Sequence, residues 1–146
     1  MESYNRLVGD FCALTGIDDV ADVLHRGLLD IDGVSIRVEC SDSGDQCRIL
    51  ADLGEVPPDR EADLYKFMLE SNFECDDEPG QPVLSMSAEG NRGVLTTHFL
   101  VSELLGEGGL VKVLREQVLP LVNAWVGTIN DDDVPDEVGR IADVAV

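Results

Sequence analysis

The sequence has few basic and few aromatic side chains. Ten lysine and arginine residues stand against 30 aspartate and glutamate residues, which gives a net charge of −20, and aromatic residues make up 5% of the chain. A surface this negative repels phosphate, and the stacking platforms that hold single-stranded nucleic acid need aromatic and basic side chains. We therefore expect neither nucleic acid nor a membrane as a partner, whereas a basic protein segment would be attracted.

Long apolar runs and paired cysteines are also missing. No run of about 18 apolar residues exists, and Met1-Glu2-Ser3 does not open a signal peptide, so we expect a cytoplasmic protein. The four cysteines show no C-x-x-C pairing, which gives no support for zinc, and disulfides are not expected in a reducing compartment. Cys40 and Cys47 could face each other across a hairpin, but small buried apolar residues are the favoured interpretation.

No pattern typical of catalysis or metal binding is present. His25 and His98 are the two histidines, and no nucleophile signature surrounds a serine or cysteine. The glycine-rich segment 106–109 lacks the spacing of a phosphate-binding loop. The acidic segments 30–33 and 131–133 do not continue as calcium-binding loops. We therefore predict a protein that is not an enzyme, with no catalytic residue, no metal and no cofactor.

What is present is a strong alternation of apolar and polar residues over 24–56. A period of two places side chains on opposite faces of a strand, so the segment predicts three antiparallel strands with one apolar and one polar face. Two leucines, Leu28 and Leu50, break the pattern because they fall on the polar face. The apolar-face positions are Gly27, Leu29, Ile31, Val34, Ile36, Val38, Cys40, Cys47, Ile49, Ala51 and Leu53.

The turn residues agree with this alternation. Asp32-Gly33 is typical of a two-residue hairpin, which sets Ile31 opposite Val34. The second loop, within 41–46, has either two or four residues, and both lengths keep Val38 on the same face as Ile49.

Outside this meander, the spacing of apolar residues predicts three helices and one more hairpin. The expected helices cover 4–14, 60–72 and 110–129, with a kink at Pro120 in the last, and the expected strands cover 83–88 and 94–101. The predicted fold class is α+β, a five-stranded antiparallel sheet with three helices in the order α-β-β-β-α-β-β-α. One domain spans 1–130, and 131–146 is an acidic tail whose apolar end could be a short docking segment.

The helix expected at 60–72 has apolar residues over more than half of its circumference. Leu64, Phe67 and Met68 occupy one face, and Tyr65 and Leu69 lie beside them. A helix of this kind must be buried on two sides. In a domain of this size, the second side indicates a partner subunit.

The whole layout resembles the small acidic chaperones of bacterial type III secretion, the class that serves individual effectors and includes the chaperone of the translocated intimin receptor. The resemblance covers residues 3 to about 130 and depends on the order of the elements as well as on the size and charge of the chain. The matching segments are the helix around Leu7 and Phe11 with Gly16, Ile31-Asp32-Gly33, Ile36-Arg37-Val38, 53–57, 67–72, 83–85 and the last helix with Trp125.

The resemblance implies a homodimer in the bacterial cytoplasm and an ATP-independent chaperone. It implies that the middle helix meets its symmetry mate, through Leu64, Phe67, Met68 and Ser71, and that the N-terminal segment of a secreted effector winds around the dimer in a non-globular form. Apolar grooves and an open sheet edge would suit such a segment. The candidate effector-binding residues are Val8, Phe11, Cys12, Leu28 and Leu50.

Two competing function classes and one structural alternative stay open at this point. An adaptor of the same fold could bind a secretion regulator instead of an effector, and a small-molecule sensor or enzyme could have an unrelated α+β fold. For Phe11 and Leu14, the alternative to a groove is that the side chains cover the core of their own chain.

Overall fold

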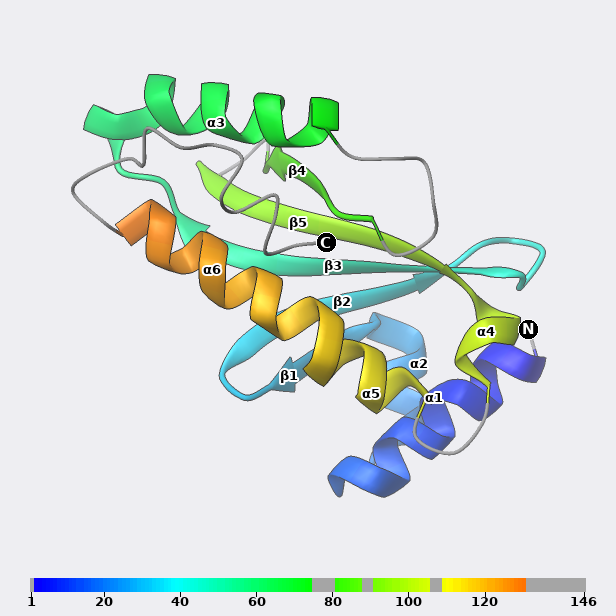
Figure 1. Ribbon diagram of the computed structural model, residues 1–146. Coiled ribbons are helices and arrows are strands. Elements are labelled where there is room, and N and C mark those ends of the chain that lie inside the picture. The colour runs from blue at the N-terminus through cyan, green and yellow to red at the C-terminus, as the bar shows by residue number, and fades with distance from the viewer. Residues whose placement is uncertain (1, 75–80, 88–90, 106–108, 131–146) are drawn as a thin grey trace.

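The computed structural model describes residues 2–74, 81–87, 91–105 and 109–130, and its fold is α+β (Figure 1). Five antiparallel strands form one sheet in the order β1-β2-β3-β5-β4. Helix α6 crosses one face of this sheet, and α3 runs beside β4 at its edge (Figure 1). The strands are β1 (Leu28–Ile31), β2 (Val34–Cys40), β3 (Gln46–Glu55), β4 (Val83–Met86) and β5 (Arg92–Leu100), and the helices are α1 (Glu2–Thr15), α2 (Val20–Arg26), α3 (Glu61–Glu74), α4 (Val101–Leu104), α5 (Gly109–Val113) and α6 (Leu119–Asn130), with a 3-10 turn at Pro58–Arg60 before α3.

The meander forms as its alternation predicts. Ile31 pairs with Val34 and Leu29 with Ile36, with Asp32 and Gly33 both at positive φ (52° and 83°) in the turn between them. Cys40 pairs with Cys47, and the N–H of Ser41 donates to the carbonyl of Gln46, which leaves a four-residue loop. The five strands and the phase of the hairpin are therefore confirmed.

The number of helices is larger than the three predicted. Residues Val20–Arg26 form α2, where an approach to the first strand was expected, and Val101–Leu104 form α4. The ends of α2 follow known rules: Asp19 caps its start by accepting a hydrogen bond from the N–H of Asp22 at 2.9 Å, and Gly27 ends it at φ 68°. A Cβ at Gly27 would lie 2.5 Å from the carbonyl oxygen of Val38, so both the conformation and the space require glycine there.

The last helix is continuous from α5 to α6 and contains a π-helical turn at Leu114–Val118. Proline has no N–H and its ring disturbs the turn before it. The helix continues through Pro120, as expected, and its wide π-helical turn lies just ahead of the proline.

The core lies between the helices and one face of the sheet. Helix α1 is fixed to the sheet by the hydroxyl of Tyr4, which donates to the carbonyl oxygen of Val38 at 3.3 Å. Trp125 of α6 is 1% exposed and its ring lies 5.0 Å from that of Phe67 of α3, with an angle of 61° between the ring planes. This edge-to-face contact joins α3 to α6 and decides which side of α3 faces inward.

Candidate functional site

The four residues predicted to meet a partner subunit lie on the inner side of α3. Leu64, Phe67, Met68 and Ser71 are all buried within this chain, with exposures between 0% and 7%. Phe67 is already in contact with Trp125. Their side chains therefore fill the core and offer no surface to a second copy, because α6 and the edge strand β4 cover this side of the helix.

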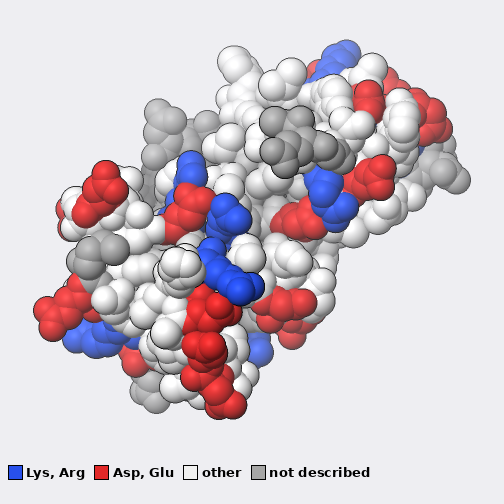
Figure 2. All heavy atoms as spheres, turned by 180° about the vertical axis from the view of Figure 1, so that it is seen from behind, with Lys and Arg blue, Asp and Glu red and all other residues white. Residues whose placement is uncertain are grey.

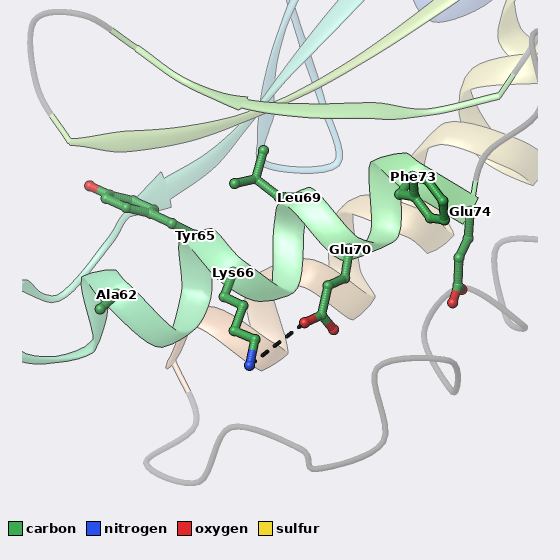
Figure 3. Close-up of a pocket in the computed structure, with 7 residues that line it drawn as sticks. All are labelled: Ala62, Tyr65, Lys66, Leu69, Glu70, Phe73 and Glu74. Carbon is green, nitrogen blue, oxygen red and sulfur yellow. Dashed lines mark ion pairs between the residues drawn. The ribbon is translucent and has the colours of Figure 1, made fainter.

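The opposite side of α3 is apolar and exposed. Leu69 is 67% exposed and Phe73 is 90% exposed. Together with Ala62 and Tyr65 they line a shallow hollow of about 720 Å³, and all of its lining residues come from α3 (Figure 3). Positions 62, 65, 69 and 73 follow a spacing of three and four, so they form one stripe along the helix. We call this stripe the α3 outer face.

The charges beside the α3 outer face are of both signs. Lys66 and Glu70, one turn apart, form an ion pair at 3.9 Å, drawn as a dashed line in Figure 3. Glu74 lies at the end of the hollow. A surface of mixed sign can meet a copy of itself, since the cation of one helix can then lie near a carboxylate of the other.

The candidate effector-binding residues of α1 also point inward. Val8, Phe11 and Cys12 are between 0% and 2% exposed, so the side chains expected in a groove are part of the core of this chain. The apolar stripe of α1 covers the sheet and the neighbouring helices, which is the alternative that the sequence left open for Phe11. For Leu14 the same alternative is wrong, because this side chain at the end of the helix is 58% exposed.

The two leucines expected on the polar sheet face are indeed there. Leu28 is 51% exposed and Leu50 is half-buried, and both pair with the same residue of β2, Arg37. The row continues over the other strands, because Leu50 pairs with Thr96 and Thr96 with Val83, which is 46% exposed. We call Leu28, Arg37, Leu50, Thr96 and Val83 the open-face row.

The cations around this row differ in their partners. Arg48 forms an ion pair with Glu39. Arg92 forms a bidentate ion pair with Asp52, in which Nε donates to Oδ1 at 3.0 Å and Nη2 donates to Oδ2 at 2.7 Å. Hydrogen bonds from Arg92 lower the pKa of Asp52, helped by the N–H of Gly54. Arg37 has no ion pair or hydrogen bond from its side chain to any other residue that the structure describes. Figure 2, seen from the side opposite Figure 1, shows Lys and Arg side chains in the middle of the molecule with Asp and Glu around them.

The remaining polar chemistry is sparse within the described ranges. No group of three or more His, Cys, Asp and Glu side chains there could hold a metal ion. Burial raises the pKa of the Cys47 thiol to about 12 and also raises that of Cys12, so both stay protonated near neutral pH. The acidic segment 131–133 and most of the glycine-rich segment 106–109 lie outside the described residues.

The described helices include none with the length and apolar character needed to cross a membrane.

Comparisons with known proteins give a match in fold. No family model and no curated protein matches the sequence. Among solved structures, this chain is similar to a chain in the crystal structure of the ExsC–ExsE complex, with 14% identity, a TM-score of 0.62, and coverage of 90% of this chain and 97% of that one. At this identity the likeness shows the fold alone, which this chain therefore shares with a chain of a protein–protein complex.

Proposed function

We propose that this chain is an ATP-independent secretion chaperone that binds the N-terminal segment of a type III effector and keeps it non-globular for export. The observation that carries the proposal is the exposed apolar surface: Phe73 and Leu69 on α3, and Leu28 and Val83 on the sheet. Patches of this kind on an otherwise charged protein mark places where other polypeptides bind. The exposed apolar surface therefore supports a function in binding another polypeptide.

Two further findings support this proposal. A chain of the ExsC–ExsE complex, an assembly of two different proteins, has the same fold. The net charge of −20 attracts a basic segment and hinders aggregation of the loaded chaperone. Holding a segment on a surface needs no nucleotide, because each apolar side chain that leaves water already contributes favourable free energy.

We propose that the working form is a homodimer and that the α3 outer face is its seam. The proposed dimer contact is made by the same helix as the sequence predicts, but by Tyr65, Leu69 and Phe73 on its outer side instead of by the residues on its inner side. Fully burying a leucine or phenylalanine contributes about 1.5–3 kcal/mol, and a twofold axis doubles every such contact. Lys66 and Glu70 supply opposite charges beside the apolar stripe.

The second candidate is an adaptor of the same fold that binds a secretion regulator. The observation that favours it is the neighbouring structure, which was crystallised as a complex of two proteins, ExsC and ExsE. An adaptor and an effector chaperone need the same exposed apolar surface, and they differ in the polypeptide that covers it.

The test is to purify the tagged chain from the bacterium that encodes it, identify the bound polypeptide, and add the isolated N-terminal segment of that polypeptide to the purified chain. At 100 times the dissociation constant, a ligand stabilises its target by about 2.7 kcal/mol, which is about 5–10 °C in Tm for a domain of this size. A C-terminal segment of the same polypeptide is the control.

An effector client is expected to give a narrow amide spectrum by NMR when bound, because it stays non-globular. A bound polypeptide that is a transcriptional or secretion regulator would favour the adaptor. A chain that is stabilised by no polypeptide segment, but is stabilised by small metabolites, would overturn both candidates.

A further inference from the structure

The centre of the open-face row is a cation, Arg37, whose side chain has no ion pair or hydrogen bond with any of the residues that the structure describes. Arg37 is exposed and lies between Leu28 on β1 and Leu50 on β3. Glu39 and Asp52 are carboxylates on the same face, but they are bonded to Arg48 and Arg92. Asp30 of β1 is also exposed on this face, diagonal to Arg37, but no ion pair joins the two side chains. A guanidinium flanked by two leucines and bonded to none of these three carboxylates is suited to a carboxylate brought by another molecule.

The spacing of the row selects the conformation of that molecule. Neighbouring strands lie about 4.8 Å apart, so Leu28 and Leu50 are separated by about 9.6 Å and Leu28 and Val83 by about 19 Å. An α-helix laid across the strands rises about 10.5 Å in seven residues and about 21 Å in fourteen. Its residues i, i+7 and i+14 would therefore lie over the apolar positions of the row.

The same helix places one further side chain over Arg37. Residue i+3 or i+4 lies about 5 Å along the axis, which matches one strand spacing. An extended segment does not fit as well, because same-side residues recur every 6.6–6.8 Å, at i+2 and then i+4, and miss the distance of about 9.6 Å between the leucines.

The charge of the whole chain limits the rest of this partner. With a net charge of −20, the protein repels a strongly acidic polypeptide at long range. We therefore expect the bound segment of the partner to contain one acidic residue among neutral and basic residues. Screening leaves the contact with Arg37 effective, because the two groups meet at hydrogen-bond distance, well inside the Debye length of about 8–10 Å.

We propose that the open-face row binds an amphipathic helix of the client in which an acidic residue stands one turn after one apolar residue and one turn before the next. This inference rests on the proposed function, since it names the part of the client that this surface recognises. Leu28, Leu50 and Val83 supply the apolar contact, and Arg37 selects the acidic residue.

The probes for the test are two alanine-based helical peptides, with leucines seven residues apart and either Glu or Lys one turn after the first leucine. Binding is measured by titration into the labelled full chain with NMR detection of the amide shifts. We expect the Glu peptide to bind at least tenfold more tightly than the Lys peptide, and Arg37→Glu to reverse this order. Lys112→Glu on α5, which makes the same change of net charge away from the sheet, is expected to keep the order.

The location of the shifts and a second variant complete the test. Shifts are expected on the strands at Leu28, Arg37 and Leu50, and Leu28→Ser is expected to weaken both peptides alike. Equal binding of the two peptides, no binding of either, or shifts confined to α3 would overturn the inference.

The peptide test separates this inference from the proposed function. If a natural N-terminal segment stabilises the chain and Arg37→Glu leaves its affinity unchanged, the chaperone function stands and this inference is wrong. If the charge reversal is seen with the peptides but no N-terminal segment is ever bound, the surface is as proposed and the chaperone function is wrong.

Discussion

The side-chain amide of Asn72 makes two hydrogen bonds with the backbone of Leu84. Its Nδ2 donates to the carbonyl oxygen at 2.8 Å, and the N–H of Leu84 donates to its Oδ1 at 2.7 Å. The side chain replaces a neighbouring strand at the outer edge of β4. It fixes α3 to the sheet and occupies, at Leu84, the backbone groups that an added strand would use.

Asn72→Ala is expected to lower the free energy of unfolding by about 1–3 kcal/mol, because it leaves two part-buried backbone groups of Leu84 without partners. Urea denaturation followed by circular dichroism measures the change. Asn123→Ala, at an exposed position of α6, is the matched control and should stay within about 0.5 kcal/mol of the wild type. Equal stabilities for the two variants would contradict the role of Asn72.

Two phenylalanines of α3 should behave in opposite ways. Phe67→Ala removes a ring packed against Trp125 in the core, which is expected to cost about 3–5 kcal/mol of folding stability. Phe73→Ala, at a side chain 90% exposed, should cost less than about 0.5 kcal/mol when the protein is dilute. Thermal unfolding of both variants at low concentration is the measurement, and similar losses would mean that α3 has a different inner side.

Phe73→Asp is expected to convert a dimer into a folded monomer, because it places a carboxylate in the apolar stripe of each α3 outer face. Sedimentation velocity measures the mass and circular dichroism checks the fold. Leu14→Asp, at an exposed apolar residue of α1, is the control and should leave the dimer intact. Phe67→Asp is not a usable test of the seam, since a charge at that buried site is expected to unfold the chain. A dimer that survives Phe73→Asp would place the seam elsewhere.

The pair of Asp52 with Arg92 should make stability depend on pH in the acid range. The pKa of Asp52 is lower in the folded chain than its ordinary value of about 3.9, so the pair stabilises the fold fully above that value and loses its effect as the pH falls through the lowered pKa. Because the pair is exposed and screened by solvent, its contribution to the free energy of unfolding is small.

The variant for this prediction is Asp52→Asn. Its difference in unfolding free energy from the wild type should be constant near neutral pH and should shrink on acidification. A difference that is the same at neutral and strongly acid pH would show that the loss comes from packing or from the hydrogen bond to Gly54 and not from the charge.

The sheet could be predicted because its signals are local. The dipeptide Asp32-Gly33 and the alternation around it fix both the register and the exposed face, so the exposure of Leu28 followed from the sequence. Helix α2 was missed although Asp19 and Gly27 mark its ends. Seven residues hold too few turns for an apolar period to be recognised.

The two sides of α3 could not be told apart from the sequence. Phe67 and Phe73 are alike in type, and either could lie in a core. Which one does is decided by Trp125, which lies against Phe67 because the last helix packs across the sheet. The candidate binding surfaces depend on the same packing of helices on the sheet, because a helix or sheet face is exposed only where no other element of the chain covers it.

The sequence by itself determined the strands, their alternation and the charge of −20, because these depend on neighbouring residues and on composition. Only the tertiary structure decided that the apolar residues of α1 lie inside, that Phe73 lies outside, and that Arg37 stands between two leucines. The physical reason is that burial and pairing across strands join residues far apart in the chain, and no local pattern records which of two similar faces will be covered.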